Sequence, residues 1–226
     1  MSQQPDTAGR ASRHVRILLV DDHPLVRERL AEIIHREADL VICGEAEDRH
    51  QALQLIKSSR PQLVIVDITL KSSDGVELIK DIHDRWPALL TLVVSMHDES
   101  LYAERALRAG ARGYITKQEA TRNILLAIRR VLAGQIYLND KVASRILGRL
   151  AAPGRARAAT PAELLADREL QVFELTGRGL NTRQIAIRLR LGVKTVETYR
   201  ARIREKLALK DPEELLPIAI TWVHKK

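Results

Sequence analysis

Three carboxylates follow two strand-like runs of the chain. The first run, Val15–Val20, leads directly into Asp21 and Asp22, and Asp67 ends an apolar run of Leu, Ile and Val residues. In an open parallel sheet such strand ends meet at the carboxyl edge, where these folds bind ligands. Clustered carboxylates repel one another unless a cation neutralises them, and Mg²⁺ prefers oxygen ligands. We therefore predict a Mg²⁺ site formed by Asp21, Asp22 and Asp67, with the main-chain carbonyl of Thr69 as a further ligand.

Two more strand-like runs end in side chains that can bind a phosphoryl group. The hydroxyl of Ser95 can donate a hydrogen bond to a phosphoryl oxygen, and the ammonium of Lys117 can pair with its charge. The predicted reaction is in-line attack by Asp67 on a phosphoryl group whose charge Mg²⁺ neutralises. Each residue alone is more commonly an ordinary surface group. Four such strand ends in one chain favour a phosphoryl site.

A parallel sheet covered by helices is needed to hold these residues at one edge. Continuous apolar runs alternate with amphipathic stretches five times within residues 15–132, which predicts a doubly wound α/β domain. The expected strands are Val15–Val20, 40–43, 63–68, Leu90–Ser95 and Gly113–Thr116. The expected helices are 24–36, 49–57, 76–85, 100–108 and 122–132.

The net charge of +8 is unevenly distributed. Residues 1–132 carry 19 basic and 19 acidic residues, whereas residues 133–226 carry 18 basic and 10 acidic residues. This asymmetry favours a neutral domain joined to one that binds a polyanion, most simply nucleic acid. A solvated basic surface is the alternative.

Cysteine content and hydropathy indicate the compartment. The single cysteine, Cys43, excludes an internal disulfide and is typical of a reducing environment. No apolar stretch approaches the roughly 18 residues that a membrane span requires, and the first 13 residues have no apolar signal-peptide core. We therefore expect a soluble cytoplasmic protein.

Residues 133–159 are predicted to link the first domain to a helical domain at residues 160–226. Residues 149–160 are rich in Ala, Arg, Pro and Gly and are expected to be flexible, whereas residues 138–150 can form a helix near the first domain. Four helices are expected in the second domain. Asp167 is the expected cap of the first, Asn181 or Thr182 caps residues 183–189, residues 194–207 form the third, and the last follows Asp211 and carries Pro217, a candidate kink.

Residues 182–206 have the pattern of a helix-turn-helix. Apolar residues recur where a small helical core needs them, and the later helix has a polar, basic face. The N-terminal half of such a helix contacts base edges, and nearby Lys and Arg bind phosphates. A solvated charged helix is the alternative, but the motif coincides with the charge excess.

The first domain resembles the receiver domain of two-component response regulators. The matching segments are Val20-Asp21-Asp22-His23-Pro24, Val66-Asp67-Ile68-Thr69-Leu70, Asp74-Gly75, Val94-Ser95-Met96 and Gly113-Tyr114-Ile115-Thr116-Lys117. The resemblance implies a flavodoxin-like (βα)5 fold and Mg²⁺-dependent phosphoryl transfer from a sensor histidine kinase to Asp67. It also implies a switch in which Ser95 moves towards the phosphoryl group and Tyr114 turns inward.

The second domain resembles a LuxR-type helix-turn-helix, so the whole chain is similar to the NarL/FixJ family. The matching segments are Leu165-Ala166-Asp167-Arg168-Glu169, Gly179-Leu180 and Glu205-Lys206-Leu207, together with the helix-turn-helix itself. By position, Glu197, Thr198 and Ala201 would face bases, while Lys194, Thr195, Tyr199 and Arg200 would mostly face phosphates. The full set of expected DNA-binding residues is Thr182, Arg183, Lys194, Thr195, Glu197, Thr198, Tyr199, Arg200, Ala201 and Arg204. Ala201 cannot hydrogen-bond a base, so sequence preference should differ from relatives with a polar residue there.

These features together predict a DNA-binding transcriptional regulator, not an enzyme, controlled by phosphorylation of Asp67. We expect the receiver either to cover part of the recognition helix or to hold the effector monomeric, until phosphorylation permits dimeric binding to an inverted-repeat promoter site. The last helix either dimerises or simply covers the core. Two other functions stay open: a phosphatase or phosphotransferase using Asp67, although Thr69 stands where such enzymes often need an acid, and a module that binds a partner protein.

Overall fold

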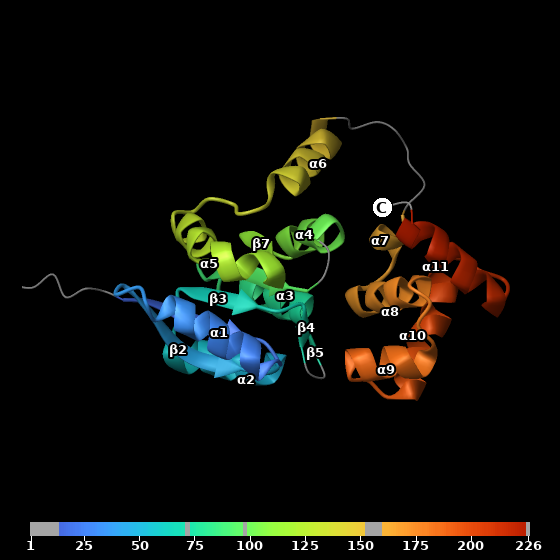
Figure 1. The fold of residues 1–226 in the computed structure, drawn as a ribbon, viewed down its shortest axis with the longest axis horizontal. Coiled ribbons are helices and arrows are strands. Elements are labelled where there is room, and N and C mark those ends of the chain that lie inside the picture. The colour runs from blue at the N-terminus through green and yellow to red at the C-terminus, as the bar shows by residue number, and fades with distance from the viewer. Residues whose placement is uncertain (1–13, 71–72, 97–98, 152–159, 225–226) are drawn as a thin grey trace, which may run out of the picture.

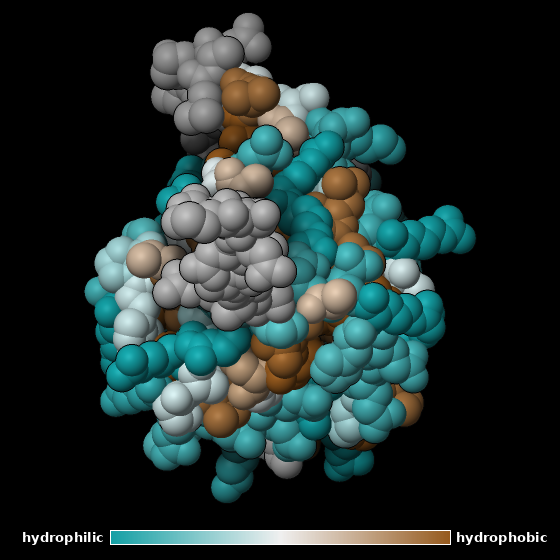
Figure 2. Space-filling view, turned by 90° about the vertical axis from the view of Figure 1, so that its left-hand side faces the viewer, coloured by the Kyte–Doolittle hydropathy of each residue, from teal (hydrophilic) through white to brown (hydrophobic). Residues whose placement is uncertain are grey.

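The computed structural model describes residues 14–70, 73–96, 99–151 and 160–224. Figure 1 shows an α/β domain beside a purely helical domain, with α6 (Asp140–Ala151) above them. The end of the α/β domain that lies at the left of Figure 1 has a mainly hydrophilic surface with small hydrophobic areas (Figure 2). Its apolar residues are therefore concentrated inside, in two cores.

A parallel sheet forms the centre of the first domain. Among the described residues it has the order β2-β1-β3-β6-β7, which is the predicted doubly wound arrangement. The strands are β1 (Val15–Val20), β2 (Leu40–Ala46), β3 (Leu63–Val66), β6 (Leu90–Ser95) and β7 (Gly113–Thr116). The expected strand at 40–43 was too short and that at 63–68 too long. Strand β3 ends at Val66 because the chain after Asp67 forms a short hairpin. The hairpin consists of β4 (Thr69–Leu70) and β5 (Ser73–Asp74), and it was not predicted.

Helices cover both faces of the sheet, and their first residues are set by capping side chains. They are α1 (Pro24–Ile34), α2 (Arg49–Ser59), α3 (Gly75–Arg85), α4 (Glu99–Arg108) and α5 (Lys117–Leu132). Asp48, Asp74 and Thr116 each accept a hydrogen bond from a main-chain N–H of the helix that follows. The Thr116 cap starts α5 five residues earlier than expected, so Lys117 is its first residue.

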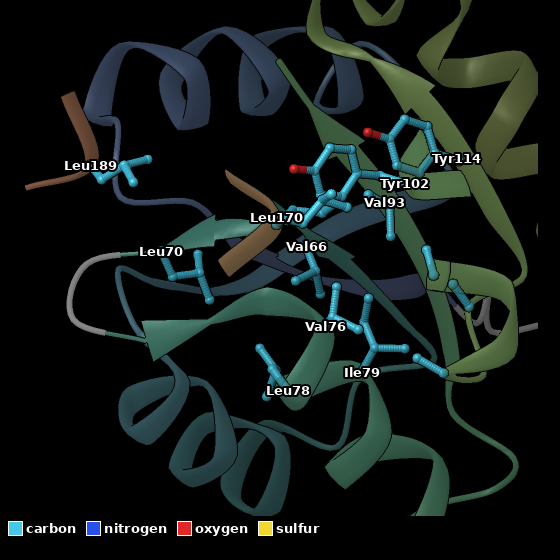
Figure 3. Packing of buried hydrophobic residues seen from close by; sticks show 14 of the residues in the cluster. Val66, Leu70, Val76, Leu78, Ile79, Val93, Tyr102, Tyr114, Leu170 and Leu189 are labelled. Carbon is cyan, nitrogen blue, oxygen red and sulfur yellow. The ribbon is translucent and has the colours of Figure 1, made fainter. Parts of the chain in front are cut away.

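Alternate residues of each strand point into opposite cores. Ile17, Leu19 and Ile65 lie in the core beneath α1 and α5. Leu18 and Val66 lie in the other core, which continues into the helical domain. Leu170 and Leu189 of that domain belong to the same cluster as Leu70, Tyr102 and Tyr114 of the first, and Figure 3 shows Leu170 beside Tyr102.

The segment after α5 is attached to the edge of the sheet. The N–H of Tyr114 donates to the carbonyl of Tyr137, and the N–H of Tyr137 donates to the carbonyl of Arg112, so this segment covers strand β7. Helix α6 follows at nearly the predicted position and buries Val142. Its last three residues were expected to be flexible, and residues 152–159 of that expected linker lie outside the described residues.

The helical domain consists, in the described residues, of a one-turn helix, four longer α-helices and a short 3-10 helix, η1 (Pro212–Glu214), which precedes the last of them. The α-helices are α7 (Pro161–Leu164), α8 (Asp167–Gly177), α9 (Thr182–Leu189), α10 (Val193–Lys206) and α11 (Leu215–His224). Ala166, not Asp167, is the N-cap of α8, whereas Asn181 caps α9 through its side chain. Pro217 lies in the first turn of α11, where a missing N–H costs no helical hydrogen bond, so the expected kink has no cause there.

Candidate functional site

Asp21, Asp22 and Asp67 meet at the carboxyl edge of the sheet. All three are buried, with exposed fractions of 3%, 5% and 3%. Carboxylate and imidazole atoms of these residues and His23 lie within 4.8 Å of one another. Strands β1 and β3 are hydrogen-bonded neighbours, and the N–H of Asp67 donates to the carbonyl of Val20 at 2.8 Å. Strand pairing therefore places the carboxylates together.

Lys117 supplies positive charge to this cluster from the first turn of α5. Its Nζ lies 2.6 Å from Asp21 Oδ2 and 2.7 Å from Asp67 Oδ2. Burial by itself lowers the pKa of Lys117, but the charges of Asp67 and Asp21 outweigh it and its pKa is raised. The lysine therefore stays an ammonium, which can pair with a phosphoryl group as well as with carboxylates.

Two features of Asp67 favour the binding of a cation. Burial raises the pKa of Asp67 to about 6, against the opposite effect of the Lys117 charge. Its Oδ2 is held by Lys117, whereas its buried Oδ1 has no hydrogen-bond partner within the described part of the chain. An unpartnered carboxylate oxygen among three buried acids fits a hard cation such as Mg²⁺.

The remaining predicted residues of this site lie around the same edge. Ser95 and Lys117 line one cavity, and Asp67 and Thr69 line a neighbouring cavity of about 320 Å³. Tyr114 is completely buried in this conformation, within the core that continues into the helical domain. Tyr102 lies between its ring and Leu170 of α8 (Figure 3), and the inward turn expected of Tyr114 stays a prediction.

The predicted DNA-binding face lies on α9 and α10. Exposed side chains on this face are Arg183, Lys194, Thr195, Glu197, Thr198 and Ala201, while Thr182, Tyr199, Arg200 and Arg204 are half-buried. Arg200 donates a hydrogen bond to the Thr182 hydroxyl at 3.0 Å, which joins the two helices of the motif. The structure thus gathers these residues on one accessible surface.

Comparison with known proteins identifies both domains. Residues 17–129 match the response regulator receiver domain, and residues 163–219 match the bacterial regulatory proteins of the luxR family. The chain belongs to the two-component response regulators. The transcriptional activator protein ExaE of Pseudomonas putida is 35% identical over 204 residues, which are 90% of this chain and 95% of that protein. The oxygen regulatory protein NreC of Staphylococcus aureus is 30% identical over 210 residues, 91% and 97% of the two chains.

Solved structures of response regulators have the same fold. A LuxR-family response regulator from Aurantimonas is 34% identical, with a TM-score of 0.57, and covers 62% of this chain and 99% of its own. RcsB of Salmonella typhimurium, at 22% identity and a TM-score of 0.61, covers 93% of this chain and 98% of its own. The predicted receiver followed by a LuxR-type DNA-binding domain is confirmed, and such proteins regulate transcription.

The effector domain of this response regulator contacts its receiver through α8 and through Arg190 at the end of α9. Arg168 donates to the main-chain carbonyl of Leu70 at 2.8 Å, and Arg105 of α4 pairs with Asp167 at 2.5 Å. Lys194 and Glu197 of α10 are exposed in this conformation, and the expectation that the receiver covers part of the recognition helix or holds the effector monomeric stays a prediction. The side chains of α8, polar ones included, are buried.

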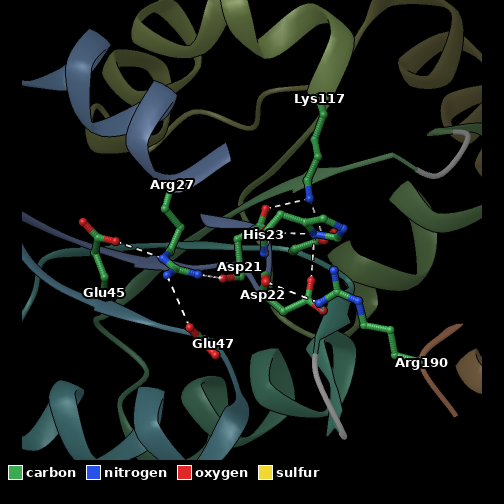
Figure 4. Close-up of polar contacts among 9 residues, drawn as sticks. Asp21, Asp22, His23, Arg27, Glu45, Glu47, Lys117 and Arg190 are labelled. Atoms are coloured by element: carbon green, nitrogen blue, oxygen red, sulfur yellow. Dashed lines mark hydrogen bonds and ion pairs between the residues drawn. The ribbon is translucent and has the colours of Figure 1, made fainter. Parts of the chain in front are cut away.

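Three basic residues next to the carboxylate cluster were missed from the sequence. His23, to which no role was assigned, has its Nδ1 3.1 Å from Asp21 Oδ1 and 2.7 Å from Asp22 Oδ1. Arg27 donates to the main-chain carbonyl of Asp21, and Arg190 pairs with Asp22 from the other domain (Figure 4). His23 could have been inferred from its place beside Asp22, but nothing local to Arg190 signals this contact.

No described helix is long and apolar enough to span a membrane.

Proposed function

We propose that this chain is a cytoplasmic transcription regulator whose DNA binding is controlled by phosphorylation of Asp67 by a sensor histidine kinase. The observation that carries this proposal is the buried cluster of Asp21, Asp22 and Asp67 with Lys117 at its centre. In this proposal Asp21, Asp22, Asp67 and the carbonyl of Thr69 hold Mg²⁺. The ion, when bound, neutralises charge on the transferring phosphoryl group.

In this proposal Asp67, Lys117 and Ser95 have separate roles in phosphoryl transfer. The Asp67 carboxylate attacks phosphorus, a bond from its oxygen forms, and the bond from phosphorus to the donor histidine nitrogen breaks. Lys117 already bonds one Asp67 oxygen and can move its ammonium to the new phosphoryl oxygens. The Ser95 hydroxyl donates to another of these oxygens, which links the modified residue to the end of β6.

Phosphorylation of the intact chain tests this proposal. Wild-type protein incubated with acetyl phosphate and Mg²⁺ is expected to gain the mass of one phosphoryl group, and Asp67→Asn is expected to gain none. Asp48→Asn is the matched control, since Asn caps a helix as well as Asp does, and it should still be phosphorylated. A mass gain that survives Asp67→Asn would disprove the assignment, and rapid turnover of a chromogenic phosphate ester would favour the phosphatase alternative.

Binding to duplex DNA is proposed for the exposed face of α9 and α10. Lys194→Ala is expected to weaken binding on all sequences and to lower the slope of log K against log salt by about 1, because one phosphate contact is lost. Lys210→Ala, an exposed change in the same domain, is the control and should keep the wild-type slope. Fluorescence anisotropy at several salt concentrations measures both, and an unchanged slope for Lys194→Ala would contradict the contact.

A homodimer on an inverted-repeat promoter site is the proposed DNA-bound form when the receiver is phosphorylated. Helix α11 supports it, because one of its faces covers the core while the other is free. Leu215 and Ala219 are buried, and the ring of Trp222 packs at a tilt against Phe173, with 5.4 Å between the ring centroids. Leu216 and Ile220, four residues apart on one side of the same helix, are exposed apolar residues. They provide a surface through which two copies can pair.

A further inference from the structure

The effector domain closes over the acceptor site of the receiver. The cavity of about 320 Å³ beside Asp67 has receiver residues on one side and effector residues on the other. Its effector side is formed by Gln171, Glu174, Leu175, Arg178, Arg188 and Leu189. Only 3% of Asp67 is exposed, and in this closed conformation the effector residues of the cavity stand between its carboxylate and a donor histidine carried on another protein.

Arg190 carries positive charge from the effector domain onto the carboxylate cluster. Its Nη1 lies 2.7 Å from Oδ2 of Asp22, whose side chain is only 2% exposed (Figure 4). The backbone of Arg190 is in the left-handed region, with φ of 53°, and its N–H caps α9 through the carbonyls of Ala186 and Ile187. The end of α9 therefore fixes the main chain of Arg190, from which the guanidinium reaches Asp22.

Two other arginines hold the domains together at positions away from the carboxylates. The Arg105 guanidinium on α4 pairs with Asp167 of α8, and it also donates to the carbonyl of Leu165 at 2.9 Å. Arg168 of α8 donates to two main-chain carbonyls of the β4–β5 hairpin, those of Leu70 and Ser73. Closure can thus be weakened independently of the metal-binding carboxylates.

We propose that Arg190 is an interdomain latch that competes with Mg²⁺ for Asp22. This inference rests on the proposed Mg²⁺ site and goes beyond it. Mg²⁺ needs an octahedral shell of oxygen ligands and retains several waters, whereas a guanidinium has only donors and repels a cation. A cation bound to Asp22 would lie close to the guanidinium that pairs with Oδ2, so charge repulsion makes Mg²⁺ binding and domain closure oppose each other.

The opposition is reciprocal by thermodynamic linkage. Opening the domains strengthens Mg²⁺ binding, and Mg²⁺ shifts the chain towards the open form by the same factor. The open form exposes Asp67 to a protein donor and frees α8. Binding of Mg²⁺ therefore increases the population of the open form, in which Asp67 is accessible, before a donor binds.

Calorimetric titration of the full chain with Mg²⁺ tests the latch. Arg190→Gln is expected to bind Mg²⁺ about tenfold more tightly than wild type, within the usual range of coupling between sites. Arg188→Gln removes the same charge from an exposed arginine that lines the same cavity, and it should stay close to wild type. Equal tightening by both changes would reduce the effect to net charge and would overturn the latch.

A second variant separates closure from local charge. Arg105→Gln breaks the contact with Asp167, and it is expected both to raise the radius of gyration measured by small-angle X-ray scattering and to tighten Mg²⁺ binding. Wild type should also expand when Mg²⁺ is added to saturation. An open Arg105→Gln protein with unchanged Mg²⁺ affinity would overturn the proposal. If neither wild type nor any variant binds Mg²⁺, the proposed metal site fails as well, whereas equal binding by all of them refutes only the latch.

Discussion

Replacing Lys117 by methionine is expected to lower the free energy of unfolding by about 3–5 kcal/mol at pH 8 in Mg²⁺-free buffer. The change keeps the length of the stem but leaves Asp21 and Asp67 buried without the ammonium that lies 2.6 and 2.7 Å from them. Breaking one side of a buried ion pair is costly because the other charge is left uncompensated. Urea denaturation of the full chain measures the loss.

The pH dependence of this loss follows from Asp67. Its pKa in the folded protein is already raised to about 6 by burial, and loss of Lys117 removes an opposing effect, so it rises further. An acid whose folded pKa is raised costs no stability below its unfolded pKa of about 3.9; its cost grows between the unfolded and the folded pKa and is constant above the folded pKa, so a further rise of that pKa adds cost only at higher pH. The deficit of Lys117→Met should therefore be small at pH 5 and largest at pH 8.

Mg²⁺ should restore part of the stability of Lys117→Met, since a cation at the carboxylates replaces the missing charge. A ligand at 100 times its dissociation constant stabilises the folded state by about 2.7 kcal/mol. Lys141→Met, an exposed change on α6, is the control and is expected to stay within about 0.5 kcal/mol of wild type. An equal deficit at pH 5 and pH 8 would show that packing of the stem, and not charge, is what the lysine contributes.

The change Gly75→Ala is expected to destabilise the receiver by about 3 kcal/mol, the upper part of the range for overpacking. A Cβ atom at position 75 would lie 2.0 Å from the main-chain oxygen of Asp67 and 2.8 Å from the Cα of Ile68. Relief of this overlap requires the backbone of Asp67, the proposed phosphoryl acceptor, to move. Phosphorylation by acetyl phosphate should therefore be impaired along with stability.

A second glycine provides the control for this prediction. Gly148 lies within α6, and a Cβ there would meet no atom within 4 Å. Gly148→Ala should stabilise the protein by roughly 0.5–1 kcal/mol, because alanine loses less backbone freedom in a helix. Wild-type stability and wild-type phosphorylation in Gly75→Ala would show that the helix start tolerates the methyl group, contrary to the contact found here.

The fold and the acceptor site could be predicted to different depths. Apolar runs that are buried on both faces identify parallel strands, and a strand end fixes the position of the next polar residue. For this reason Asp21, Asp67 and Lys117 could be assigned to one edge from the chain alone. Helix limits were less certain, because caps such as Thr116 act through a single hydrogen bond that competes with neighbouring alternatives.

The sequence by itself determined the family, the doubly wound parallel sheet and the residues at its carboxyl edge, since these depend on hydropathy and on residue type at strand ends. Only the tertiary structure decided how the domains meet. The contact between Arg190 and Asp22 joins residues 168 positions apart, and the packing of α8 on the receiver leaves α10 exposed. Such contacts depend on the shape and charge of two folded surfaces, and no local pattern of residues encodes them.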